Sequence, residues 1–149
     1  VEGSTYQDNE HKFEAGTPRI AEAIGWKAAM DYLEKVDLDA EHHRLLEIAR
    51  WTAEALRNLG CTVYGRHDDL DSAVVSFLHP ALHAEDMAHL LDAEGYAVRT
   101  GHHCAQPLLH RLGISSTVRA SFYLYNTMEE AEGFVNALEM VLDRFGGST

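Results

Sequence analysis

Cysteine is scarce in this chain, and its scarcity excludes one class of small protein. The 149 residues contain two cysteines, Cys61 and Cys104. A secreted domain of this size held together by disulfide bonds would usually carry more. The sequence therefore favours a reducing, cytoplasmic setting. Cys61 opens an apolar stretch, and we expect it to be a small buried hydrophobic residue.

Basic residues are also few. Twelve Lys and Arg stand against 24 Asp and Glu, which gives a formal net charge of −12. Such an acidic surface repels phosphate backbones and anionic lipid headgroups, so neither nucleic acid nor a membrane is an expected partner. The chain has no apolar run long enough to span a bilayer and no signal-peptide pattern. It starts with Val1 and a polar, irregular segment, which is typical of a fragment, a processed chain or a segment chosen for expression.

The sequence is long enough for a single domain with its own core, and its apolar residues recur with regular spacing. Apolar spacing predicts helices over residues 18–36, 40–58, 84–94 and 128–145. The first helix begins at Thr17-Pro18, a hydroxyl cap followed by proline. The last begins with a capping box at Thr127–Glu130. The faces expected to be buried are Ile20, Ile24, Met30 and Leu33; Leu45, Ala49, Ala53 and Leu56; Met87, Leu90 and Leu91; and Ala131, Phe134, Val135, Leu138, Val141, Leu142 and Phe145.

Short β-branched or apolar stretches between these helices predict strands. They cover residues 61–64, 73–78, 96–98 and 118–125, with a polar turn over 65–71 and a loop over 99–107. The predicted fold class is a mixed α/β domain, a small and mostly antiparallel sheet covered by helices. We place this domain at residues 17–149 and treat residues 1–16 as a tail or linker.

The segment Arg99-Thr-Gly-His-His-Cys-Ala-Gln-Pro107 carries the residues best suited to chemistry. Cationic neighbours stabilise a thiolate, which is the nucleophilic form of cysteine. A guanidinium in a partly desolvated cleft binds a carboxylate through two parallel hydrogen bonds. Cys104 with Arg99 and Arg119 therefore suggests a reactive thiol beside an anion-binding arginine.

Three alternatives for these side chains stay open. Both arginines could form structural ion pairs with acidic neighbours. His102 and His103 could cap backbone groups of the loop. A zinc site would be built from His102, His103, Cys104 and His110, but this spacing matches no closed four-ligand pattern, and we expect no metal.

Three stretches resemble landmarks of the Suf-type (group II) cysteine desulfurases, which include selenocysteine lyase-like members. The stretches are Phe13-Glu-Ala-Gly-Thr-Pro18, Arg99–Pro107 and Arg119-Ala-Ser-Phe-Tyr-Leu-Tyr-Asn-Thr127, in family order and with similar spacing. These enzymes belong to the class V aminotransferase group of fold-type I pyridoxal-phosphate enzymes. The resemblance implies the C-terminal small domain of such an enzyme.

The resemblance also implies roles for particular residues. In the family a protein thiolate attacks the sulfur of L-cysteine, leaving alanine and a protein persulfide for iron-sulfur cluster assembly. Cys104 matches that thiolate, and Arg119 matches the arginine that binds the substrate carboxylate. Arg99 matches an active-site arginine beside the catalytic loop. Gly16 and Thr17 match the pair that reaches across a homodimer to the cofactor phosphate. A sulfur-acceptor scaffold protein is the implied partner.

The chain departs from the family in lacking a suitable cofactor lysine. Its three lysines, Lys12, Lys27 and Lys35, lie in the tail or on the first predicted helix. We therefore expect this chain alone to bind no pyridoxal phosphate covalently and to be inactive. Two other functions stay open. One is a non-catalytic module that docks a sulfur-acceptor protein, and the other is a selenocysteine lyase.

Overall fold

The computed structural model describes residues 3, 5, 8–14, 16–65 and 71–146. The chain divides into two compact units, Val1–Leu38 and Asp39–Thr149, and each is described by itself. The larger unit carries the whole sheet. The domain boundary at residue 17 stays a prediction. The predicted turn over 65–71 lies mostly outside the described residues.

The first unit contains a short 3₁₀ helix, η1 (Glu10–Phe13), and the helix α1 (Ile20–Leu33). The helix predicted over 18–36 is therefore present. Its expected inner face is mostly exposed, because Ile20 is 62% exposed, Ile24 67% and Met30 47%. The remaining member, Leu33, is half-buried. Helix α1 has no buried residue. A helix with apolar residues on all sides usually needs a neighbour around it.

The start of α1 also differs from the expectation. The residue flanking the helix is Arg19, which makes no side-chain capping bond. The N–H of Ile20 donates to the carbonyl of Pro18 at 2.9 Å. Thr17 therefore lies before the helix instead of capping it, and the predicted hydroxyl cap of this helix is wrong.

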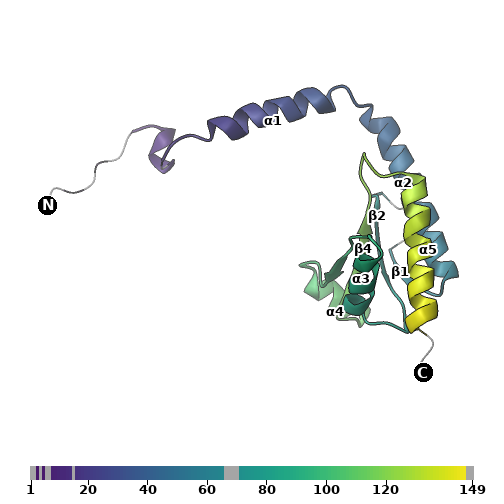
Figure 1. Cartoon of the computed structure of the whole chain (residues 1–149). Coiled ribbons are helices and arrows are strands. Elements are labelled where there is room, and N and C mark those ends of the chain that lie inside the picture. Colours follow the sequence, from purple (N-terminus) through teal and green to yellow (C-terminus); the bar gives the residue numbers. More distant parts are fainter. Residues whose placement is uncertain (1–2, 4, 6–7, 15, 66–70, 147–149) are drawn as a thin grey trace. The chain divides into compact units, whose positions relative to one another are not determined.

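The second unit is a four-stranded sheet with helices. Its elements are α2 (Leu38–Asn58), β1 (Thr62–Tyr64), β2 (Val74–Leu78), α3 (Ala84–Ala93), β3 (Arg99–Gly101), α4 (Gln106–Leu112), β4 (Thr117–Ser121) and α5 (Met128–Phe145). The strands lie in the order β1-β2-β4-β3, and every neighbouring pair is antiparallel. Helix α3 packs against α5 and against β3 and β4 (Figure 1). The predicted fold class is confirmed.

The core lies on one face of this sheet. Alternate strand residues point into it, namely Val75 and Phe77 on β2 and Val118 and Ala120 on β4. Helices α2, α3 and α5 cover this face with their apolar sides. The helix residues of this core are Ala49, Ala53, Leu56, Ala84, Met87, Leu91, Phe134, Val135, Ala137 and Leu138. Because side chains alternate along a strand, Arg119 between Val118 and Ala120 belongs to the opposite face.

The predicted inner faces of α2, α3 and α5 are largely confirmed. The exceptions are Leu90 and Leu142, which are half-buried, and Phe145, which is 47% exposed. Phe145 is the last residue of α5, where the helix runs past the core. The capping box of Thr127 with Glu130 is formed as predicted.

Three strand and loop boundaries are corrected. Residues 96–98 form no strand, and β3 begins instead at Arg99, inside the segment expected to be a loop. Helix α4 follows it, with Pro107 in its first turn and Gly113 ending it in the left-handed conformation at φ 72°. Strand β4 stops at Ser121 rather than at residue 125.

Leu138 provides a direct test of this core. Its side chain is 0% exposed, so Leu138→Ala should lower the free energy of unfolding by about 2–5 kcal/mol through lost burial and the cavity left behind. Urea denaturation followed by circular dichroism would measure the change. The exposed neighbour Glu139 is the matched control, and Glu139→Ala should shift stability by about 0.5 kcal/mol or less. Equal effects of the two substitutions would contradict this packing.

Candidate functional site

Strand pairing places the two predicted arginines beside each other. Arg99 on β3 is the direct partner of Arg119 on β4, and side chains of directly paired residues project from the same sheet face. This face is opposite the core formed with α2, α3 and α5, because the next pair, Thr100 and Val118, includes a core residue. Ser76 on β2 is the other direct partner of Arg119. Two cationic side chains therefore start from neighbouring positions on this face.

Neither arginine forms an ion pair with a carboxylate of the described residues. Like charges placed directly opposite each other on a sheet destabilise it. The alternative in which Arg99 and Arg119 are structural ion pairs therefore has no support. An anion bound between them would relieve their repulsion.

Cys104 lies just beyond the end of β3 in a strained turn. Gly101 leaves the strand at φ 109°, and His103 and Cys104 follow with φ of 51° and 59°. A left-handed backbone costs a residue with a Cβ roughly 1–2 kcal/mol, and strain of this kind is typical of functional sites. The turn leaves Cys104 exposed to solvent. Its free thiol therefore lies at the surface, a few residues from Arg99.

The two histidines of the turn, His102 and His103, form different hydrogen bonds. The Nδ1 atom of His102 accepts the N–H of Cys104 at 3.0 Å, so its expected role as a backbone cap is confirmed. The Nε2 atom of His103 lies 3.1 Å from the carbonyl oxygen of Thr117 on β4. Because a carbonyl only accepts, Nε2 carries a proton, and in the neutral ring Nδ1 is then an acceptor.

The surroundings of His103 lower its pKa. Burial lowers its pKa, and the positive charges of Arg119, Arg99 and His102 lower it further, while the hydrogen bond to Thr117 opposes the shift. Its Nδ1 atom is shielded from solvent and has no hydrogen-bond partner. In the part of the chain that the structure describes, no group of three or more His, Cys, Asp or Glu side chains gathers to hold a metal.

Comparison with known proteins places these features in a family. The family profile described as "Aminotransferase class-V" matches residues 1–134. The chain belongs to the class-V aminotransferase family. A probable cysteine desulfurase of Staphylococcus epidermidis is 44% identical over 143 residues, and one of Staphylococcus aureus strain COL is equally similar. Each alignment covers 95% of this chain and 35% of the relative.

Solved structures agree with this class-V assignment. The apo cysteine desulfurase of Thermococcus onnurineus NA1 matches with a TM-score of 0.84 and 39% identity, over 95% of this chain and 36% of that one. The cysteine desulfurase CsdA of Escherichia coli, solved in an S-sulfonic acid form, matches at 0.83 and 35% identity, over 97% and 37%. The chain thus spans about a third of the length of these relatives.

Class-V aminotransferases generally use pyridoxal phosphate, and the described residues do not form a complete site for it. The unit Asp39–Thr149, which carries Cys104 and both arginines, contains no lysine. In the other unit Lys27 is paired with Asp31 at 2.6 Å, and Lys12 stacks over the Phe13 ring. Gly16 has a positive φ of 90° and is exposed, as is Thr17. Their phosphate role stays a prediction.

A direct measurement tests the lysine argument. After this 149-residue chain is mixed with pyridoxal phosphate and reduced with borohydride, we expect no stoichiometric lysine adduct. Peptide mass mapping of Lys12, Lys27 and Lys35 would detect one. A full-length class-V cysteine desulfurase treated in parallel is the positive control, and an adduct at one defined lysine of this chain would contradict the expectation.

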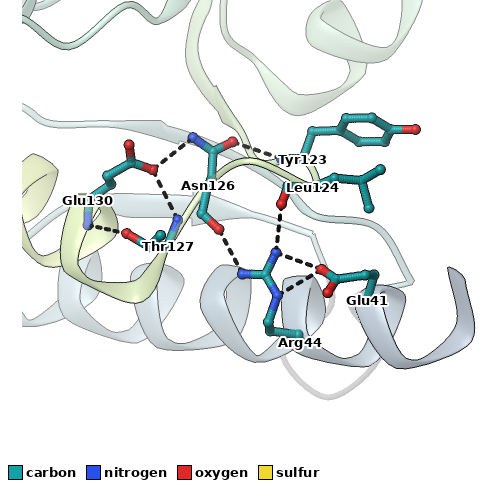
Figure 2. A network of polar contacts seen from close by, with 7 residues as sticks. All are labelled: Glu41, Arg44, Tyr123, Leu124, Asn126, Thr127 and Glu130. Carbon is teal, nitrogen blue, oxygen red and sulfur yellow. Dashed lines mark hydrogen bonds and ion pairs between the residues drawn. The ribbon is translucent and has the colours of Figure 1, made fainter. Parts of the chain in front are cut away.

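Sequence reasoning missed a polar network that secures the turn after Arg119. The guanidinium of Arg44 on α2 donates to the carbonyls of Asn126 at 2.7 Å and Leu124 at 3.1 Å, and it pairs with Glu41 at 2.7 Å. The Asn126 amide oxygen accepts the N–H of Tyr123 at 2.8 Å (Figure 2). Asn126 thus has a structural task. No sequence signal links Arg44 to a turn some 80 residues away.

Proposed function

We propose that this chain is the C-terminal part of a pyridoxal-phosphate-dependent cysteine desulfurase, with Cys104 as the nucleophile that takes sulfur from L-cysteine. One observation carries the proposal. The exposed thiol of Cys104 lies on a strained turn that follows strand β3, and β3 pairs Arg99 directly with Arg119. The relatives named as probable cysteine desulfurases support the same reaction class.

The chain's own residues would act in two ways. Arg119 binds the substrate carboxylate through two parallel hydrogen bonds, with Arg99 adding positive charge beside it. The Cys104 thiolate then attacks the sulfur of L-cysteine. A new S–S bond forms as the Cβ–S bond of the substrate breaks, the carbon takes up one proton and leaves as L-alanine, and Cys104 keeps the persulfide.

The remaining machinery lies outside this chain. A longer protein would supply the pyridoxal phosphate site, and with it the activation of the substrate carbon. Gly16 and Thr17 would contact the cofactor phosphate across a homodimer. The persulfide would pass to a sulfur-acceptor scaffold protein for iron-sulfur cluster assembly in the cytoplasm. No helix among the described residues could cross a membrane. The chain alone would be inactive.

The persulfide itself tests this proposal. The intact enzyme, meaning this chain joined to the remainder of a family-length protein, would be incubated with L-cysteine without an acceptor. Alkylation followed by peptide mass spectrometry should then find one extra sulfur on Cys104. Omitting L-cysteine is the control. Extra sulfur on Cys61, or on neither cysteine while alanine is produced, would refute the assignment.

The arginine pair gives a second test in the intact enzyme. Arg119→Lys should impair the use of L-cysteine more than Arg99→Lys does, because lysine keeps the charge but loses the two-pronged grip. The expected loss in kcat/KM is about 1.5–3 kcal/mol, or roughly 10- to 150-fold. Arg99→Lys is the matched control on the paired strand. Wild-type kinetics for Arg119→Lys would remove the carboxylate-binding role.

A further inference from the structure

Two unpaired atoms at this site complement each other. Among the described residues, the polar side-chain atoms that are shielded from solvent and lack a hydrogen-bond partner are Nδ1 of His103 and Nε of Arg119. With its proton on Nε2, His103 can only accept at Nδ1, whereas the Nε–H of arginine can only donate. Shielded polar atoms without partners are rare in folded proteins. The unpaired acceptor Nδ1 and the unpaired donor Nε–H are therefore complementary hydrogen-bonding groups.

The fold brings these two side chains to the same place. His103 reaches across to the carbonyl of Thr117 at 3.1 Å, and Thr117 lies two positions before Arg119 on β4. The bond joins the His103 ring to the main chain of this strand, close in sequence to Arg119. The charge of Arg119 is the largest charge effect on the pKa of His103, ahead of Arg99 and His102. The His103 ring therefore lies against β4 beside Arg119.

The backbone also favours histidine at this position. The φ of 51° at His103 is a conformation that histidine, asparagine and aspartate adopt more readily than most residues. A glycine adopts it freely. The ring is thus held by its own backbone geometry and by the bond to Thr117, and both fix the direction of its free Nδ1.

We propose that His103 is a positioning residue for Arg119. Its neutral ring donates Nε2–H to Thr117 and accepts the Nε–H of Arg119 when a substrate carboxylate binds. The guanidinium is then fixed with its two terminal nitrogens free for that carboxylate. This inference rests on the proposed function, since it assigns His103 a part in binding L-cysteine.

Kinetics of three variants of the intact enzyme test this role. His103→Gly removes the ring but keeps the left-handed backbone, and it should raise KM for L-cysteine roughly tenfold with a smaller change in kcat. His103→Asn keeps an acceptor oxygen and the backbone preference, and it should recover part of the loss. Adding His103→Gly to Arg119→Lys should cost little more, because the two residues act as one unit. Wild-type KM in His103→Gly, or full additivity with Arg119→Lys, would overturn the proposal.

A second readout does not depend on activity. In this 149-residue chain, the pKa of His103 can be followed by NMR of the imidazole ring. Arg119→Gln should raise that pKa more than Arg99→Gln does, because Arg119 is the larger charge effect. An unchanged His103 pKa in Arg119→Gln would refute the contact even if Cys104 carries the persulfide. A raised pKa without any persulfide would instead refute the proposed function and leave the contact standing.

Discussion

Replacing Cys104 by serine should abolish sulfur transfer from L-cysteine to an acceptor while leaving pyridoxal phosphate bound. A serine hydroxyl keeps the size and polarity of the side chain but has no sulfur with which to form a persulfide. The exposed position of Cys104 means that the substitution disturbs no core packing. Loss of transfer would therefore report on the chemistry and not on folding.

The experiment uses the intact enzyme and three measurements. Absorbance of the bound cofactor checks that the site is assembled, alanine production follows the carbon product, and sulfur bound to an acceptor follows the transfer. Cys61→Ala is the matched control and should keep transfer, since Cys61 is 6% exposed in the core. Sulfur loading of an acceptor by Cys104→Ser would refute the role of Cys104. Retained turnover of selenocysteine alone would favour a selenocysteine lyase, because selenium leaves more easily.

The sequence was most informative where local signals and burial agree. Helix α5 has a capping box at Thr127 and an apolar stripe that includes Phe134 and Leu138, and all of these are present in the structure. The same holds for α2, whose inner face is buried as expected. In such segments the hydrophobic period and the cap specify the same helix, so tertiary packing does not change the outcome.

The missed features depend on partners that a single sequence does not show. Strand β3 is three residues long, and Arg99 becomes part of a strand only because β4 offers it hydrogen bonds. Three residues are too few for a period to appear. Helix α1 has the apolar spacing of a buried helix, yet none of its side chains is buried in this chain. Periodicity predicts that a helix forms, but it does not identify what covers the helix.

The candidate site, too, could be predicted from the sequence only in part. The segment from Arg99 to Pro107 and the later Arg119 were predicted from residue types and from the family resemblance. The direct pairing of Arg99 with Arg119 is a property of strand register, which sequence does not give. The hydrogen bond from His103 to Thr117 likewise joins two segments across that register. The catalytic and binding roles of these residues stay predictions.

In the isolated chain, a limiting amount of a neutral thiol reagent at pH 7 should label Cys104 far faster than Cys61. Burial raises the pKa of Cys61 to about 11, so at pH 7 roughly one Cys61 thiol in 10,000 is ionised. The thiolate is the form that reacts. Cys61 is also 6% exposed, whereas Cys104 is open to solvent. Both ionisation and access therefore slow the reaction of Cys61.

The pH dependence and the unfolded chain separate these two causes. As the pH rises toward 11, Cys61 ionises and its labelling rate should increase as far as access allows. In concentrated urea the burial is lost, so Cys61 should react readily at much lower pH. Peptide mass spectrometry after short labelling times would give both rates, with Cys104→Ala and Cys61→Ala as single-thiol controls. If Cys61 of the folded chain reacts first at neutral pH, the thiol of Cys104 is not accessible to the reagent. That result would refute Cys104 as the nucleophile.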